Sequence, residues 1–512
     1  MKMDKQESNL DLFIKDIENA LKKGDSGALR TSLSFRLSNE FVFASMMDNG
    51  EIYHYNGGCY VPGAENLISK RCSQLMDAAS AKDRLNSHLV HEVIEEIRRD
   101  CLTERELFDA NPQLISCKNY VLNVVSGETF SHGPEHKLFI QIPVYYDAHA
   151  TCPLFEKFLS ETVPPAHIST AWEIIGYCLY RSMPIQRAIM LLGSGKNGKS
   201  VFLAVLRSLL GKENCKAILL QSFEANRFSL SGLSGALANI APDLPGEALK
   251  GTGNFKALLG GDLIFSEQKF KNGFEFVNTC KLLFSANQLP ATPDESNAYF
   301  RRWLILDFPN TFEGDADDKN LLAKLTTEGE LSGILNKALV ALRELLKKGE
   351  FSGAQGTDEL RERYLRMSDS TASFFMDCLE VSPEDEVIKS FLFPAYLRYC
   401  KQEHVPAASE KTFFKGLFER ANVYETQKKL PEGRVRVIRG IRLIVIDCSE
   451  PIKEINQNNQ QNLTYAQDAQ DAQGFSHINR RESNIYINKE NAVHPVHGVQ
   501  NIPNNNQSEV IP

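Results

Sequence analysis

Residues 193–200 read GSGKNGKS, that is Gly193, Ser194, Gly195, Lys196, Asn197, Gly198, Lys199 and Ser200. This is a complete G-x-x-x-x-G-K-[ST] pattern. Glycines at these places let the backbone wrap closely around a triphosphate and point its N–H groups at the phosphate oxygens. Lys199 can then reach the β- and γ-phosphates, and the Ser200 hydroxyl can ligate Mg²⁺. The loop therefore predicts a site for ATP, with Mg²⁺ as cofactor.

The segments on both sides of this loop fit a phosphate cradle. Residues 188–192 are apolar and predict a buried strand, while residues 201–210 predict a helix that stops at Gly211. Such a helix presents its N-terminal dipole to an anion. Strand-like and helix-like segments then alternate to about residue 312, which is typical of a parallel α/β sheet. The alternative interpretation is a glycine-rich turn that binds no ligand, and such a turn would not require a strand before it and a helix after it.

Composition limits where the protein can contact its partners. The net charge of −8 means that nucleic acid must meet a local basic patch rather than a generally basic surface. The eleven cysteines include no C-x-x-C pair, which argues against a zinc ribbon or a disulfide framework and favours buried free thiols. Residues 1–23 lack the apolar stretch of a signal peptide, and no apolar run approaches the ~18 residues that span a bilayer. We expect a soluble, cytoplasmic protein without a membrane partner.

The order of patterns along the chain predicts several domains. A helical N-terminal segment precedes a mixed α+β region, and two helices followed by a basic hairpin near the end outline a winged helix. The last part is rich in Asn and Gln and cannot bury enough apolar surface to offset its ordering entropy. The expected domains are a helical segment 1–39, an α+β domain 40–148, an ATPase core 149–312, a helical linker 313–380, a winged-helix domain 381–450 and a disordered tail 451–512.

Several motifs together resemble one helicase family. The Gly-x-Gly-x-Asn-Gly-Lys-Ser form of the loop, with PVYYD at 143–147 and GYCL at 176–179, is similar to the superfamily III helicases of phage and plasmid primase-helicases, which include the poxvirus-type enzyme. The resemblance runs from about Tyr53 to Leu443 and is strongest over 140–312. It implies an AAA+-like P-loop core and a ring-forming motor, with a hexamer as the expected assembly.

The resemblance also assigns roles to residues of the core. Residues 235–241 look like the Walker B strand, and Asp243 would hold Mg²⁺ through water at the carboxyl edge of the sheet. Many family members carry a glutamate or two adjacent acids here, whereas this chain reads Asp243-Leu-Pro with Glu247 further on. The general base for water attack is therefore either Asp243 or Glu247.

Two further motifs resemble parts of a ring ATPase. Asn287, at the end of an apolar strand that starts at Lys281, is similar to sensor 1, although an Asn in this place can also simply cap a turn. Arg301 and Arg302 resemble the arginine finger that one subunit supplies to the next. The alternative for this pair is an ordinary solvated surface position.

Candidate DNA contacts come from two basic hairpins. Residues 260–274, with Lys269 and Lys271, resemble the hairpin that enters the central channel of such helicases, although a solvated basic turn has the same composition. Residues 433–440 carry Arg434, Arg436 and Arg439 on the expected wing.

These features predict an ATP-dependent DNA helicase that replicates a plasmid, phage or provirus. The expected partners are single-stranded or forked DNA, other copies of the chain, and a separate primase or polymerase, because the sequence shows no primase domain. One alternative is a replication initiator that uses ATP only to assemble on DNA. The other, a P-loop phosphotransferase, is disfavoured by the sensor and finger motifs.

Overall fold

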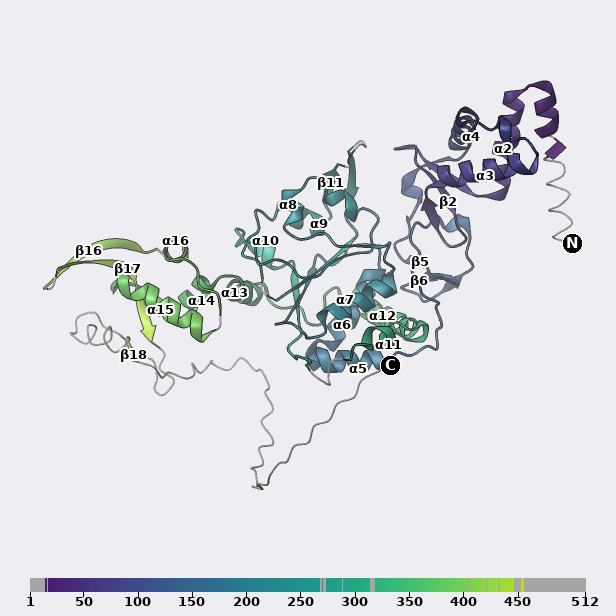
Figure 1. The fold of residues 1–512 in the computed structure, drawn as a ribbon. Helices are drawn as coiled ribbons and strands as arrows, with labels where there is room; N and C mark the ends of the chain where they lie inside the picture. The colour runs from purple at the N-terminus through teal and green to yellow at the C-terminus, as the bar shows by residue number, and fades with distance from the viewer. Residues whose placement is uncertain are drawn as a thin grey trace, which may run out of the picture. The chain divides into compact units, whose positions relative to one another are not determined.

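The structure is a computed structural model whose chain divides into two compact units, Met1–Asp369 and Ser370–Pro512 (Figure 1). The expected tail lies outside the described residues except for 453–454, as do residues 1–13 of the expected N-terminal segment. The structure describes residues 14–15, 17–267, 269, 273–287, 289–313, 318–403, 405–420, 422–431, 433–445 and 453–454.

A five-stranded sheet forms the centre of the first unit, and every neighbouring pair of its strands is parallel. Strands β8, β10 and β13 are buried along their whole length, because helices cover both faces of such a sheet. The expected mixed α/β fold with a parallel sheet is confirmed. The strand order is β14 (Trp303–Asp307), β8 (Ala188–Leu192), β13 (Lys281–Ala286), β10 (Ala238–Ala241) and β9 (Cys215–Lys216).

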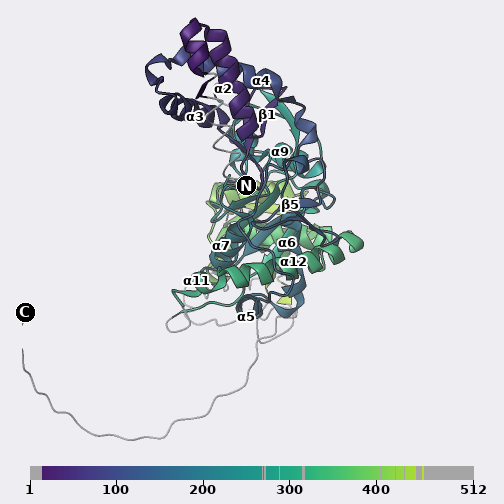
Figure 2. The same ribbon diagram turned by 90° about the vertical axis from the view of Figure 1, so that its right-hand side faces the viewer.

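Helix α12 (Glu328–Lys348) packs against α6 (Ile168–Leu179) and belongs to the core of this unit; the two lie side by side in both views (Figures 1 and 2). At their contact, a Cβ on Gly176 would lie 2.3 Å from the Ala338 carbonyl oxygen, so only glycine fits there. The leucines of α12 share one apolar cluster with α6. Residues 321–368 therefore belong to the first unit rather than forming the linker expected over 313–380.

Four more helices of the first unit lie around this core. They are α5 (Pro153–Thr162), α7 (Lys199–Leu210), α11 (Leu321–Leu325) and α13 (Thr357–Ser368). The apolar residues of α5 and α7 are buried with those of the sheet, so the loop between β8 and α7 stands on a packed base.

The region before the core is α+β. Its helices are α2 (Ser26–Glu40), α3 (Ala64–Ala78) and α4 (Ser87–Asp100), and side-chain caps from Asp25 and Asn86 begin α2 and α4. One sheet has the order β3 (Tyr60–Pro62), β2 (Ile52–Tyr55), β1 (Phe43–Met46) and β4 (Leu102–Thr103), and a second has β5 (Leu114–Ser116), β6 (Val121–Asn123) and β7 (Thr129–Phe130).

The second unit consists of helices on a small antiparallel sheet, in which β17 lies between β15 and β16. The two expected helices and the hairpin are present. Helix α14 and strand β15 were not foreseen, since the strand is mostly acidic and polar in sequence. In chain order the elements are α14 (Ser370–Cys378), β15 (Leu379–Ile388), α15 (Lys389–Gln402), α16 (Glu410–Arg420), β16 (Tyr424–Leu430), β17 (Gly433–Val445) and β18 (Lys453–Glu454).

No helix in the described part of the chain combines the length and apolarity that crossing a bilayer requires.

Candidate nucleotide site

The loop 193–200 joins the end of β8 to the start of α7 and depends on its glycines. Gly195 and Gly198 have φ angles of 114° and 88°, which side chains with a Cβ rarely adopt. A Cβ on Gly193 would lie 2.5 Å from the Phe308 carbonyl oxygen, and one on Gly198 would lie 2.7 Å from Thr162. The loop is therefore held tightly between its neighbours, and the N–H of its first residue, Gly193, donates to the Ala286 carbonyl oxygen of β13 at 3.4 Å.

Lys199 is buried at the centre of this loop, although it carries a charge. Its ammonium group donates to the Gly193 carbonyl oxygen at 2.6 Å, to Asn197 Oδ1 at 2.9 Å and to Asn287 Oδ1 at 3.1 Å. Burial lowers the pKa of Lys199, and the negative charge of Asp243 partly offsets this effect. The loop thus fixes one cation where the phosphates of a nucleotide would lie.

Asn197 explains why the fifth position of the loop is an amide. The residue is buried, and its Nδ2 donates to the Phe308 carbonyl oxygen at 3.1 Å while its Oδ1 accepts from Lys199. Both polar ends of the Asn197 side chain therefore make hydrogen bonds. Because one of them is to the residue that follows β14, Asn197 ties Lys199 to the end of that strand.

Strand register brings the other two core residues to the same edge of the sheet. Ala286 lies beside Leu192, so the residue that follows β13, Asn287, lies level with the start of the phosphate loop. Asp243 follows β10 with a φ of 54°, and the N–H of the next residue, Leu244, donates to the Ser285 carbonyl oxygen at 2.8 Å. The structure therefore places the loop, Asn287 and Asp243 together.

The oxygens at this edge suit a magnesium ion. Ser200 and Asp243 are both exposed, and hydroxyl and carboxylate oxygens are ligands that Mg²⁺ prefers. Glu247 is also exposed and lies four residues further along the chain. The donor types fit the expected cofactor, while the choice between the two acids as general base stays open.

The two adjacent arginines differ in burial. Arg301 is exposed, whereas Arg302 is 8% exposed and donates from Nη1 to the Ala298 carbonyl oxygen at 2.5 Å. Burial and the neighbouring Arg301 lower the pKa of Arg302. Sequence reasoning treated the residues as equivalent, but only Arg301 has a side chain that another molecule can reach.

Arg301 lies at the amino-terminal ends of the parallel strands, whereas the phosphate loop follows the carboxyl-terminal end of β8. It precedes β14, whose first residue Trp303 lies beside Ala188 at the start of β8. The loop begins after Leu192, at the other end of β8, and four residues of strand span roughly 13 Å. Arg301 therefore cannot serve the phosphate site of its own chain.

A tyrosine that sequence reasoning missed connects these segments. Tyr364 of α13 donates to the Pro290 carbonyl oxygen at 2.8 Å, just after Asn287, and its hydroxyl lies 2.9 Å from that of Tyr299. Tyr299 belongs to α10 (Asn297–Phe300), which leads into Arg301. One hydroxyl thus links the sensor segment to the arginine segment within a buried aromatic cluster.

A second missed residue is Lys281, the first residue of β13. It is 1% exposed, and its ammonium group donates to the carbonyl oxygens of Tyr180, Ser182 and Thr279 at 2.5, 2.9 and 2.8 Å. Burial lowers the pKa of Lys281 to about 8. The strand that carries Asn287 at one end is therefore anchored by a buried cation at the other.

Where the sequence predicted a hairpin, the structure has the antiparallel pair β11 (Leu263–Ser266) and β12 (Phe274–Val277), beside α8 (Ser222–Ala225) and α9 (Gly253–Gly260). At its base, buried Asn278 donates to the Leu258 carbonyl oxygen of α9 at 3.0 Å. Lys269 is exposed and lies 6.0 Å from the Phe228 ring centroid, while Lys271 lies outside the described residues. An exposed cation and an aromatic ring are thus adjacent at this hairpin.

The three arginines expected on a wing lie on β17 of the second unit. Arg434, Arg436 and Arg439 are all exposed, and β17 pairs with β16 along the whole hairpin. Arg436 and Arg439 form ion pairs with different acids.

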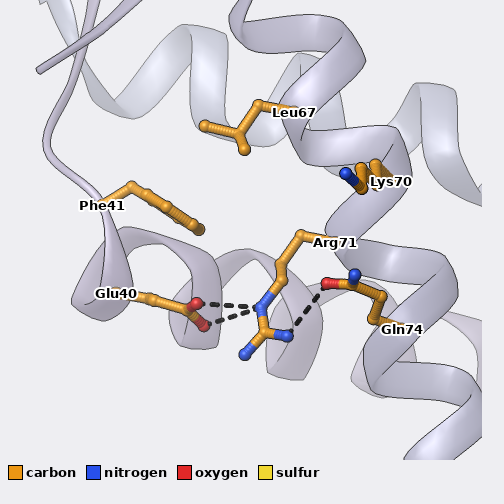
Figure 3. Close-up of a pocket in the computed structure, with 6 residues that line it drawn as sticks. All are labelled: Glu40, Phe41, Leu67, Lys70, Arg71 and Gln74. Atoms are coloured by element: carbon orange, nitrogen blue, oxygen red, sulfur yellow. Dashed lines mark hydrogen bonds and ion pairs between the residues drawn. The ribbon is translucent and has the colours of Figure 1, made fainter. Parts of the chain in front are cut away.

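A groove of about 310 Å³ lies between α2 and α3 of the first unit (Figure 3). Phe41 and Leu67 line it together with Arg71, whose Nε is 2.8 Å from Glu40 and whose Nη1 donates to Gln74 at 3.1 Å. The charge of Arg71 is therefore already matched. None of the residues of the loop 193–200 lines this groove, and we assign no role to it.

Family models match two parts of the chain. Residues 40–164 match the family described as D5 N terminal like, and residues 191–302 match a family of unknown function, DUF5906. The second match contains the phosphate loop, Asp243, Asn287 and both arginines. Each match covers less than half of the chain.

Solved structures with low sequence identity are also similar. One is described as "The A form apo structure of NrS-1 C terminal region-CTR", with 10% identity and a TM-score of 0.42 over 80% of this chain and 98% of that chain. Another, "The apo structure of NrS-1 C terminal region (305-718)", gives the same identity, coverage and TM-score.

Proposed function

We propose that the chain is an ATP-dependent DNA helicase of the superfamily III type, which acts in the replication of a phage, plasmid or provirus. The observation that carries this proposal is the contact of Lys199 with both its own loop and Asn287, at the edge of the sheet that also holds Asp243. ATP hydrolysis requires a loop that binds the phosphates and polar residues beside it that can position water and metal, here at the ends of neighbouring strands.

In this proposal the loop 193–200 binds the phosphates of ATP, and Lys199 leaves its protein acceptors for the β- and γ-phosphates. Ser200 and Asp243 would hold Mg²⁺, which neutralises phosphate charge when it is bound. Asn287 orients the attacking water or the γ-phosphate. Asp243 or Glu247 accepts the proton of that water.

Assembly follows from the position of Arg301. Because this residue lies at the edge of the sheet opposite its own phosphate loop, it can serve only the loop of a neighbouring copy. An arginine supplied in this way stabilises the charge of the transferred phosphoryl group. We propose a ring of identical chains, with six copies as the resemblance implies.

DNA contact is proposed for both units. The hairpin with Lys269 offers a cation beside an aromatic ring, which suits single strands. In the second unit, the order helix, strand, two helices and hairpin supports a winged helix. The D5 N-terminal-like match before the core agrees with the resemblance to the primase-helicases. A separate primase or polymerase would then supply the primers.

Unwinding of a labelled forked duplex in the presence of ATP and Mg²⁺ tests the proposal. We expect the wild-type chain to release the displaced strand and Lys199→Ala to release none, because the variant loses the cation that contacts the phosphates. The variant should keep the wild-type circular dichroism spectrum. ATP turnover without strand release would favour the initiator, and wild-type turnover in folded Lys199→Ala would refute the phosphate site.

A further inference from the structure

The cations of the β16–β17 hairpin divide between its two faces. Lys429 lies directly across from Arg434, and Gln427 from Arg436. Because side chains alternate along a strand, these four residues share one face, here called the basic face. Lys428 lies on the other face, as does Arg439, which pairs with Tyr424.

On that other face the cations are neutralised by one acid. Glu386 of β15 is 7% exposed, and its carboxylate accepts from Arg439 Nε at 3.1 Å and also from the ammonium group of Lys428. A buried carboxylate needs such partners, since an unpaired buried charge is costly. Arg439, expected from the sequence to bind DNA, is therefore already paired with an acid of its own chain.

The basic face, in contrast, carries more cations than acids among the described residues. Lys429 and Arg434 are exposed and have no ion pair or hydrogen bond from their side chains within the described residues. Arg436 shares Glu425, at 3.2 Å, with Lys389, at 2.7 Å, so one acid faces two cations. Lys429 and Arg434 are the basic-face residues nearest the turn of the hairpin.

The helices of the second unit lie on the same side of the sheet as the basic face. Val387 and Ile438 are cross-strand partners in line with Glu425, which puts them on this face, and both are buried in one cluster with residues of α15 and α16. Beyond this cluster the two strands run on past α15 (Figure 1). Helices and basic face therefore present one continuous side to a partner.

We propose that the basic face binds duplex DNA, with Lys429 and Arg434 contacting phosphates. This inference rests on the proposed action of the chain on DNA. A two-stranded ribbon fits the major groove of B-DNA. The face carries cations and an amide but no aromatic ring on which unpaired bases could stack, which favours duplex over single strands. Helix α16 is less suited to make the main contact with DNA, because its exposed Lys411 and Lys415 are flanked by two glutamates.

The test compares two double variants of the full chain in binding a labelled duplex without nucleotide, over a range of salt concentrations. Lys429→Gln with Arg434→Gln removes two proposed contacts. Arg398→Gln with Lys401→Gln removes the same charge from exposed positions on α15. At roughly 0.9 per phosphate contact, the first pair should flatten the salt slope by about 1.8 and weaken duplex binding. The second pair, and Arg439→Gln, should leave the slope unchanged.

Three results would overturn the proposal: an unchanged slope in the first pair, an equal loss in the α15 pair, or a loss confined to single-stranded DNA. ATP turnover without DNA should be unchanged in every variant, which shows that the first unit is intact. If the wild-type chain binds duplex through the basic face but does not hydrolyse ATP, the helicase proposal fails and this one stands. If the wild-type chain unwinds DNA but the first pair of substitutions does not alter the salt slope of duplex binding, the helicase proposal stands and this one fails.

Discussion

The ammonium group of Lys199 donates to the side-chain oxygen of Asn287 at 3.1 Å and so joins the phosphate loop to the end of the neighbouring strand. Lys199 keeps two other acceptors, so loss of this one should leave nucleotide binding within a few-fold of wild type. We expect Asn287→Ala to lower kcat by roughly 10²-fold, the usual effect of removing one polar group that acts on the transition state. ATPase rates and ATP affinity measured on the same sample separate the two effects. An unchanged kcat would make Asn287 a turn cap.

The two exposed acids after β10 can be told apart by isosteric amides. Asp243 lies two residues after the end of β10, and Glu247 lies four residues further on. If Asp243 both holds Mg²⁺ and activates water, Asp243→Asn should abolish turnover and raise the Mg²⁺ concentration needed for ATP binding. Glu247→Gln should then retain most of its activity. A Glu247→Gln variant that binds ATP normally but does not turn it over would instead assign the base to Glu247.

Arg301→Ala and Arg302→Ala should fail in different ways. Loss of exposed Arg301 should reduce hydrolysis by roughly 10³-fold or more at unchanged nucleotide affinity and unchanged thermal stability. Loss of buried Arg302 should lower the melting temperature, because its side chain fills space beside Ala298. Calorimetry together with ATPase assays distinguishes the outcomes.

Mixing adds a second test of Arg301. Lys199→Ala supplies an intact arginine and Arg301→Ala supplies an intact loop, so a mixture of the two should regain some activity that neither has alone. No recovery in the mixture, with each variant still assembling, would argue against an arginine acting between copies.

Lys281 predicts an unusual pH dependence of stability. Its pKa is about 8 in the folded chain and near 10.5 when the chain unfolds. Between these values the unfolded chain binds the proton and the folded chain does not, so wild-type stability rises with pH relative to Lys281→Met. The difference in unfolding free energy should change by on the order of 3 kcal/mol over this window. Denaturant titrations of both proteins from pH 7 to about 10.5 measure it, and a flat difference would refute the shifted pKa.

The sequence predicted the strands around the site well, and for a physical reason. Strands 188–192 and 281–286 are buried in a parallel sheet, so the first is a continuous apolar run and the second has an apolar centre at 282–284, and both are followed by polar residues within the next two positions. The glycine pattern likewise fixed the loop between β8 and α7. These features depend on residues that are adjacent in the chain.

What the sequence did not predict depends on contacts between distant segments. Arg301 and Arg302 are neighbours of the same type, and only packing decides which one is buried. Lys281 finds its acceptors about a hundred residues earlier in the chain, at Tyr180 and Ser182. The period of two along a strand predicts that Arg439 lies on the opposite face from Arg434 and Arg436. Its partner Glu386 was not predicted, because the acidic composition of β15 does not indicate a strand.

The opposed positions of Arg301 and the phosphate loop also bear on symmetry. If each copy gives its arginine to another, the residue that gives and the loop that receives lie at different places on the same chain. A two-fold dimer would make this contact twice, once in each direction, whereas a contact made in one direction only is heterologous. Repetition of one heterologous contact leads either to a closed ring or to an open helix, according to whether the rotation per copy closes. If Arg301 acts between copies in a ring, the position of this one side chain gives the assembly a direction, with a leading and a trailing face for every subunit.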